Sequence, residues 1–137
     1  MKDYTPIFEF GHGLLIPTSV NSIPPKLFLI DTGSFDNMLS LAEAKEVTKV
    51  NTEYTWGVKG LSGKTKTVYS ASNATIQFSN VRQQREDLVT IDMTRTSDSF
   101  GTEISGVLGF AMLWMLDMKI DYRDGLVKFT VETRFVQ

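Results

Sequence analysis

The sequence predicts a single, mainly β domain, and two observations lead to that prediction. Short apolar or alternating runs are interrupted by glycine, proline or asparagine about every ten residues, which is typical of strands joined by turns. The 137 residues are 42% hydrophobic and 22% charged, so the chain holds enough apolar sequence to bury a core of ordinary size. We therefore expect one lobe over residues 1–137, either whole or cut from a longer protein.

The first strands are expected to form a hairpin. Residues 6–10 and 14–20 are strand-like, and the Gly-His-Gly sequence at residues 11–13 between them favours a tight turn. After a second connection, the continuous apolar run at residues 26–30 predicts a buried strand. This strand delivers the chain directly to Asp31.

A short helix and a long hairpin are expected next. Ser40, followed three residues later by Glu43, forms a capping box and predicts about two helical turns up to residue 47. Residues 51–80 are rich in threonine, valine and tyrosine and are broken by glycines. They predict a long hairpin whose tip lies at residues 58–63.

The last third of the chain alternates between strands and short connections. Residues 87–92 predict a strand, and the polar residues 93–103 are the best candidate for a mobile loop. Residues 110–116 are helical in composition. Strands at residues 118–122 and 126–131, joined by an Arg-Asp-Gly turn, are expected to close the fold.

Charge and hydropathy exclude several classes of partner. Fourteen basic and sixteen acidic residues give a net charge of -2 without a run of either sign, which argues against a nucleic acid or an anionic membrane. No apolar run approaches the ~20 residues of a membrane span, and the first residues lack the apolar core of a signal peptide. An exported protein would carry its signal outside this segment, so the compartment stays open.

We expect no metal and no cofactor. The absence of cysteine excludes disulfides, zinc–thiolate sites and thiol nucleophiles. The sole histidine, His12, lies in a predicted turn, so one chain cannot build a histidine-based triad or a multi-histidine metal site. Asp117, Asp121 and Asp124 lack the spacing of a calcium loop.

Residues 28–34 hold the sharpest local feature, Phe-Leu-Ile-Asp-Thr-Gly-Ser. Taken alone, this motif also fits a strand that simply ends in a turn. The context adds Val107-Leu108-Gly109, an apolar pair and a glycine placed before the predicted second helix. Together these residues resemble the aspartic peptidases of the retropepsin-like superfamily, and especially the single-lobe domains of bacterial aspartyl proteases. The resemblance covers nearly the whole chain, with the family's elements in the right order.

The resemblance implies a closed acid-protease barrel with one or two short helices, acting as an aspartic endopeptidase on extended peptides. Asp31 would be the catalytic carboxylate, supported by Thr32, Gly33 and Ser34. Thr32 would lock two lobes together, and Ser34 would donate a hydrogen bond to the outer oxygen of Asp31. That bond would favour the ionised carboxylate, so an acidic optimum is expected. The expected substrate-binding residues are Asp36, Gly60, Leu61, Ser62, Val107, Leu108 and Gly109.

A single Asp-Thr-Gly supplies one carboxylate, so the resemblance implies a second lobe, either an identical chain or another part of a longer polypeptide. We favour a homodimer in which residues 1–7 and 130–136 supply edge strands at the interface. Phe35 stands where retroviral relatives usually carry an acid, and Phe110 where relatives often carry an arginine or an acid. Substrate anchoring and any ion pair between lobes are therefore expected to differ.

Two other readings of the sequence remain. The first is a non-catalytic module that keeps the fold, grips peptides or partner domains, and cleaves nothing. The second is an unrelated β-barrel binding domain in which Asp31 merely ends a strand.

Overall fold

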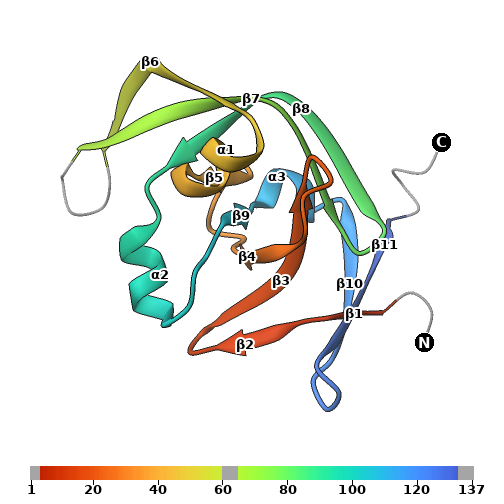
Figure 1. Ribbon diagram of the computed structural model, residues 1–137. Helices are drawn as coiled ribbons and strands as arrows, with labels where there is room; N and C mark the ends of the chain where they lie inside the picture. Colours follow the sequence, from red (N-terminus) through yellow and green to blue (C-terminus); the bar gives the residue numbers. More distant parts are fainter. Residues whose placement is uncertain (1–3, 60–64, 133–137) are drawn as a thin grey trace.

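The computed structural model describes residues 4–59 and 65–132 of the chain, which fold around a strongly curved sheet (Figure 1). The elements in chain order are β1 (Thr5–Pro6), β2 (Phe8–Phe10), β3 (Gly13–Val20), β4 (Lys26–Ile30), β5 (Met38–Ser40), α1 (Leu41–Val47), β6 (Lys49–Lys59), β7 (Thr65–Phe78), β8 (Val81–Ile91), α2 (Thr94–Phe100), β9 (Gly106–Leu108), α3 (Phe110–Leu113), β10 (Leu116–Asp121) and β11 (Leu126–Val131).

The main sheet closes on itself. Its strands follow the order β2-β3-β4-β9-β5-β8-β7-β6, and an additional antiparallel pairing joins β3 to β7 through Ser19 with Gln77 and Val20 with Ile76. This pairing leaves β2 and β6 outside a ring formed by the six strands between them. The prediction of a mainly β, closed fold with few and short helices is confirmed.

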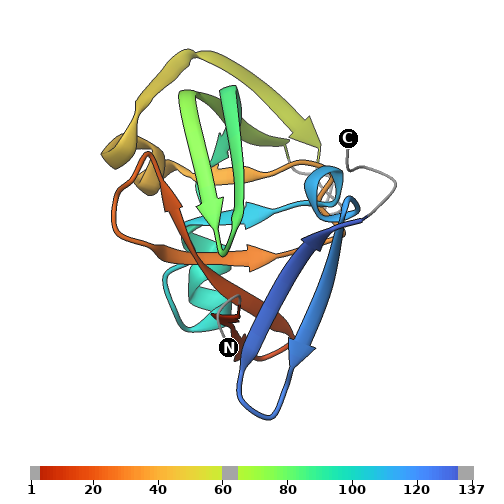
Figure 2. The ribbon, with the colours of Figure 1, turned by 90° about the vertical axis from the view of Figure 1, so that its right-hand side faces the viewer.

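A smaller sheet of three strands, in the order β1-β11-β10, stands beside the ring (Figure 2). The strand predicted at residues 126–131 coincides with β11. The helix predicted at residues 110–116 is shorter than expected, because α3 ends at Leu113 and Leu116 already begins β10. Thr5 and Pro6 pair with β11 of the same chain, and residues 1–3 and 133–136 of the predicted interface strands lie outside the described residues.

Strands β3, β4 and β9 are buried on both faces, because neighbouring residues on each strand belong to different cores. In β4, Phe28 enters the main core, whereas Leu29 enters a second cluster. The same alternation divides Leu108 from Val107 in β9. The period of two along a strand produces this division. The strand that carries the sequence motif is therefore held from both sides.

Helix α2 occupies the segment that the polar composition predicts as a mobile loop, so that prediction was wrong. The Asp92 carboxylate accepts hydrogen bonds from the Thr94 amide at 2.9 Å and the Thr94 hydroxyl at 2.7 Å, which orders the start of the helix. Gly101 ends it in the left-handed region at a φ of 72°. Phe100 packs against the second core, so an apolar anchor holds an otherwise polar helix.

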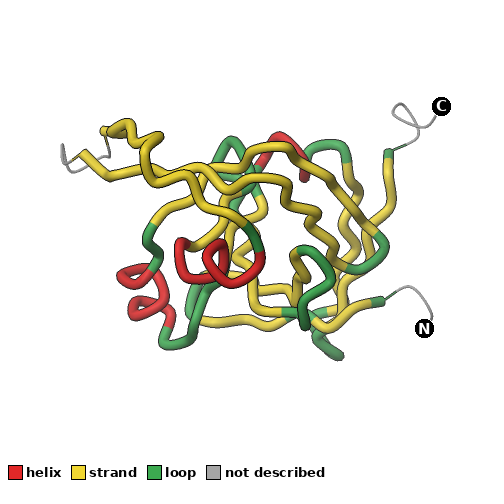
Figure 3. The backbone as a smooth tube through the Cα atoms, turned by 45° about the horizontal axis from the view of Figure 1, so that its top comes forward, coloured by secondary structure: helices red, strands yellow, loops and turns green. Residues whose placement is uncertain are grey.

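The predicted capping residue and long hairpin are both present. Ser40 is the N-cap of α1 and accepts a hydrogen bond from the Glu43 amide at 3.0 Å. Strands β6 and β7 form the hairpin, which projects from the body in Figure 3. Strand β8 begins at Val81, whereas the sequence predicts a start at residue 87. In the part of the chain that is described, no helix is both long and apolar enough to cross a membrane.

Candidate active site

Asp31 lies at the end of β4, where two parallel strands end side by side. Strands β4 and β9 pair in parallel (Figure 2). The Asp31 amide donates a hydrogen bond to the Leu108 carbonyl at 3.0 Å. The chain then turns sharply, since the Ser34 amide donates to the Asp31 carbonyl at 3.1 Å. Asp31 is half-buried at the start of this turn. Because the sequence predicts Asp31 as the catalytic carboxylate, we call residues 31–37 the catalytic loop from here on.

Gly33 lies directly against the Asp31 carboxylate. Its amide donates a hydrogen bond to Asp31 Oδ1 at 2.9 Å. A Cβ atom at Gly33 would lie 3.1 Å from the same oxygen, closer than nine in ten real Cβ contacts. A side chain at this position would therefore crowd the Asp31 carboxylate, and glycine avoids that contact.

The hydroxyl groups on either side of Gly33 point elsewhere. Thr32 is exposed on the lobe. The Ser34 hydroxyl donates to the Asp36 carbonyl at 3.0 Å, whereas the sequence led us to expect a bond to the outer oxygen of Asp31. Ser34 thus stabilises the turn of the catalytic loop in the isolated lobe. Its hydroxyl does not make the bond to Asp31 from which the sequence predicts an acidic optimum.

Gly109 packs against the back of the catalytic loop. A Cβ atom on Gly109 would lie 2.6 Å from the Asp36 carbonyl carbon and 2.8 Å from the Ser34 carbonyl oxygen. Real Cβ atoms essentially never approach backbone so closely, so only glycine fits here. Val107 and Leu108 before it are buried in the two cores. These three predicted substrate-binding residues lie inside the lobe, under the catalytic loop.

Helix α3 begins on the same loop. The Phe110 amide donates to the Ser34 carbonyl and the Ala111 amide to the Phe35 carbonyl, each at 2.7 Å. The first turn of a helix has amide groups without intrahelical partners, and here the catalytic loop supplies their acceptors. The loop and α3 therefore fold as one unit.

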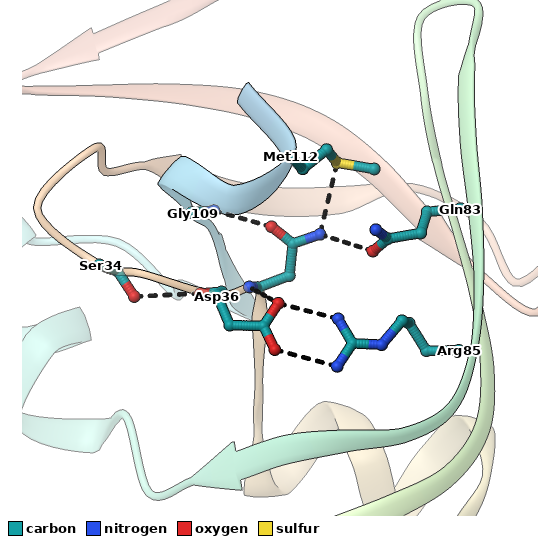
Figure 4. Close-up of polar contacts among 7 residues, drawn as sticks. Ser34, Asp36, Gln83, Arg85, Gly109 and Met112 are labelled. Carbon is teal, nitrogen blue, oxygen red and sulfur yellow. Dashed lines mark hydrogen bonds and ion pairs between the residues drawn. The ribbon is translucent and has the colours of Figure 1, made fainter. Parts of the chain in front are cut away.

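Asn37 is a site residue that the sequence reasoning missed. Its side chain is buried, with 1% exposed, and its Oδ1 accepts a hydrogen bond from the Gly109 amide at 2.7 Å. Its Nδ2 donates to Gln83 Oε1 at 2.9 Å and approaches Met112 Sδ at 3.3 Å (Figure 4). Asn37 therefore connects the catalytic loop to β8 and to α3.

Asp36 makes the second connection to β8. Arg85 Nη1 and Nη2 donate to Asp36 Oδ1 and Oδ2 at 2.8 and 2.9 Å, and Figure 4 shows this two-bonded pair. These hydrogen bonds hold the pKa of Asp36 below its usual range, although partial burial opposes them. Both carboxylate oxygens already have a partner within the lobe, so Asp36, which we expected to bind substrate, has a structural contact instead.

The predicted tip of the hairpin, Gly60, Leu61 and Ser62, lies outside the described residues. The strands on either side of it are described: β6 ends at Lys59 and β7 begins at Thr65. The pairing of Lys59 with Thr65 leaves the five residues 60–64 as the connection.

Other candidate sites lie away from Asp31. A cavity of about 600 Å³ is lined by residues of α1, β7, β8 and α2, and Asp31 is not one of them. Within residues 4–59 and 65–132, no group of three or more histidine, aspartate or glutamate side chains is placed to hold a metal ion.

Comparisons with known proteins agree with this geometry. A model of the family described as "Aspartyl protease" matches residues 16–112, which include the catalytic loop and Gly109. A search of curated protein sequences gave no significant match.

Three solved structures share the fold. A retropepsin-like aspartic protease from Rickettsia conorii has a TM-score of 0.55 and 15% identity, covering 90% of this chain and 86% of that chain. EIAV protease, complexed with the inhibitor HBY-793, has a TM-score of 0.54 and 18% identity, covering 78% and 90%. The retroviral protease-like domain of Ddi1 from Leishmania major has a TM-score of 0.51 and 11% identity, covering 94% and 97%. The fold is therefore retropepsin-like.

Proposed function

Because the chain belongs to the aspartyl protease family, we propose that it is an aspartic endopeptidase in which Asp31 supplies one of two catalytic carboxylates. The observation that carries the proposal is the placement of Asp31 at the end of β4, with its carboxylate bonded by the Gly33 amide. The family and the fold support aspartic protease activity in general, and hence a hydrolase.

A pair of carboxylates can hydrolyse a peptide without a metal or a covalent intermediate. Two carboxyl groups about 3 Å apart cannot both ionise, so they share one proton. The ionised group takes a proton from a water molecule as the water oxygen bonds to the scissile carbonyl carbon, and the other group protonates the carbonyl oxygen. A proton then passes to the amide nitrogen as the C–N bond breaks, which yields an amine and a carboxylic acid.

We propose that the second carboxylate comes from a second lobe, with an identical chain as the first candidate. Thr32 is exposed beside Asp31, where its hydroxyl is free to bond across a two-fold axis. Phe35 is 77% exposed, and Phe110 stacks on Trp114 with ring centroids 6.5 Å apart. Exposed aromatic groups next to the catalytic loop favour an apolar contact between lobes in place of an ion pair.

The substrate in this proposal is an extended peptide. It would lie over Asp31 and under the β6–β7 hairpin, with Gly60, Leu61 and Ser62 as the flap that closes on it. The catalytic loop would keep its shape through two sets of residues. Val107, Leu108 and Gly109 would support it from behind, and Ser34 and Asp36 would stabilise it from within. An acidic optimum is retained, because the shared proton is needed for catalysis.

The Asp31→Asn variant tests this proposal. It should lower peptide hydrolysis to background, about 10³-fold or more, while circular dichroism and the melting temperature stay unchanged, because one ionisable carboxylate is lost without a change of shape. Asp124→Asn, which changes an exposed aspartate in the turn between β10 and β11, is the matched control and should keep full activity.

Two further outcomes separate the alternatives. If Asp31→Asn cleaves as fast as the wild type, Asp31 is not catalytic. If neither protein cleaves but both bind a statine-type peptide, the chain is a peptide-binding module of the same fold. For a homodimer, activity per chain should fall on dilution. Activity that appears only after a different lobe is added would show that the second carboxylate comes from a partner.

A further inference from the structure

We propose that Asn37 is a positioning residue for the reaction: with Gln83 it fastens the end of the catalytic loop to β8 and so sets the position of the Asp31 carboxylate. This inference rests on the proposed aspartic protease activity. Neither Asn37 nor Gln83 belongs to the sequence motif that marks the site.

The Asn37 amide is satisfied in a single orientation. Its oxygen accepts from the Gly109 amide at 2.7 Å, and its nitrogen donates to Gln83 Oε1 at 2.9 Å and faces Met112 Sδ at 3.3 Å. A buried amide that lost these partners would carry the full cost of desolvation. The network therefore holds one arrangement of loop, helix and strand against the alternatives.

The anchor for Asn37 lies on a paired strand, β8. Gln83 and Arg85 are two residues apart and point to the same face of the strand, toward the catalytic loop (Figure 4). Both are half-buried, whereas their neighbour Gln84 is exposed on the other face. Strand β8 pairs with β7 at both positions, Gln83 with Ile76 and Arg85 with Ala74, and its pairing with β5 begins further along, at Val89.

The loop is fixed at both ends. At its start the Asp31 amide is bonded to Leu108, and at its end Asn37 is bonded to Gly109, one residue further along the same segment. Between these points, the two first amides of α3 hold the loop carbonyls. Loss of the Asn37 contacts would leave the end of the loop held by the Asp36–Arg85 pair and by the start of β5, without its buried link to Gly109. A displacement of about 1 Å in a catalytic group can cost about 100-fold in rate.

The test uses Gln83→Ala and Asn37→Ala, with Gln84→Ala as the matched control. Gln83→Ala removes the acceptor for Asn37 without opening the core, and should lower kcat about 10-fold with KM within about 3-fold of the wild type. Asn37→Ala should lower kcat about 100-fold. Gln84→Ala should leave both constants unchanged. A change in KM alone, or unchanged kcat in a folded Gln83→Ala protein, would overturn the proposal.

Amide hydrogen exchange separates this inference from the proposed activity. If the wild type and Asp31→Asn are equally inactive, the endopeptidase proposal fails, and exchange still reports on positioning. Gln83→Ala should speed exchange of both the Gly109 and the Asp31 amides, relative to Gln84→Ala. Faster exchange at Gly109 with an unchanged Asp31 amide would show that Asn37 serves only local packing. If Asn37→Ala does not fold, the comparison of Gln83→Ala with Gln84→Ala is sufficient to test the proposal.

Discussion

Asp36 precedes β5 in the chain and Glu43 follows it, and each carboxylate faces a basic side chain. Their pKa values nevertheless shift in opposite directions. Two hydrogen bonds from Arg85 hold the pKa of Asp36 below its usual range. Glu43, only 3% exposed, has its pKa raised by burial, although Lys26 Nζ lies 3.6 Å from its Oε1. Among the described residues that oxygen has no hydrogen-bond partner, and Lys26 donates to Glu46 instead.

The difference has two causes. Asp36 is 30% exposed and hydrogen-bonded through both oxygens, whereas Glu43 is 3% exposed and incompletely paired, so for Glu43 the cost of burial outweighs the nearby positive charge. The catalytic loop holds a carboxylate paired through both oxygens, whereas the start of α1 holds one that is buried and incompletely paired. We therefore expect acidic conditions, under which the proposed dyad would work, to weaken the first region and to relieve the second.

The most severe break of the catalytic loop should come from Gly109→Ala. The new Cβ atom would lie 2.6 Å from the carbonyl carbon of Asp36, so either the loop or α3 has to move. We expect the free energy of unfolding to fall by about 3 kcal/mol and peptide hydrolysis to fall about 100-fold. Urea denaturation and the initial rate of peptide cleavage measure the two effects.

Gly101→Ala is the control for this prediction. Gly101 has a φ of +72° and no atom within 4 Å of an added Cβ, so its substitution costs about 1 kcal/mol through the backbone alone. Activity should be retained. Equal losses of activity in the two variants would show that general destabilisation, and not the displaced loop, explains the result.

The two regions also differ in how far the sequence predicted them. Ser40 and Glu43 are three residues apart, so the N-cap of α1 was visible as a local pattern. Asp31 was also local, because its apolar strand and the glycine after it are contiguous. Gln83 and Arg85 are 46 and 49 residues from their partners in the loop, and no spacing rule marks them.

Helix α2 is a segment for which the sequence-based prediction was wrong. Its composition is polar, and its stability depends on a tertiary contact, the packing of Phe100 on the second core. The local signals, Asp92 before the helix and Gly101 after it, were present but were consistent with a loop as well. The prediction failed because tertiary packing, and not propensity, decided the segment.

The pairing of Asp36 is tested by Asp36→Asn across pH. Because folding lowers the pKa of Asp36, its pair with Arg85 stabilises the fold at pH values above the ordinary pKa of the group, near 3.8. This contribution is lost as the pH falls through the lowered pKa. At neutral pH the variant should therefore unfold about 1.5 kcal/mol more easily than the wild type. The difference should vanish in strong acid, measured by urea denaturation at each pH.

Asp98→Asn, which changes an exposed aspartate on α2, should have little effect at any pH. A difference between Asp36→Asn and the wild type that persists below the lowered pKa would mean that the side chain acts by shape, and not through its ionised contact with Arg85.

The smallest effect, and the one of opposite sign, is expected for Glu43→Gln. Burial raises the pKa of Glu43. The group therefore stabilises the fold at pH values below its ordinary pKa, near 4.5, and this contribution is lost as the pH rises through the raised pKa. Removal of the charge should stabilise the protein at neutral pH by about 1 kcal/mol, and by nothing at pH values where Glu43 is protonated.

Glu46→Gln, on the exposed side of the same helix, is the control and should be neutral or slightly destabilising, because it removes a surface partner of Lys26. If Glu43→Gln destabilises the protein at neutral pH, the contact with Lys26 outweighs the cost of burial. Glu43 would then, like Asp36, be stabilised by its basic partner.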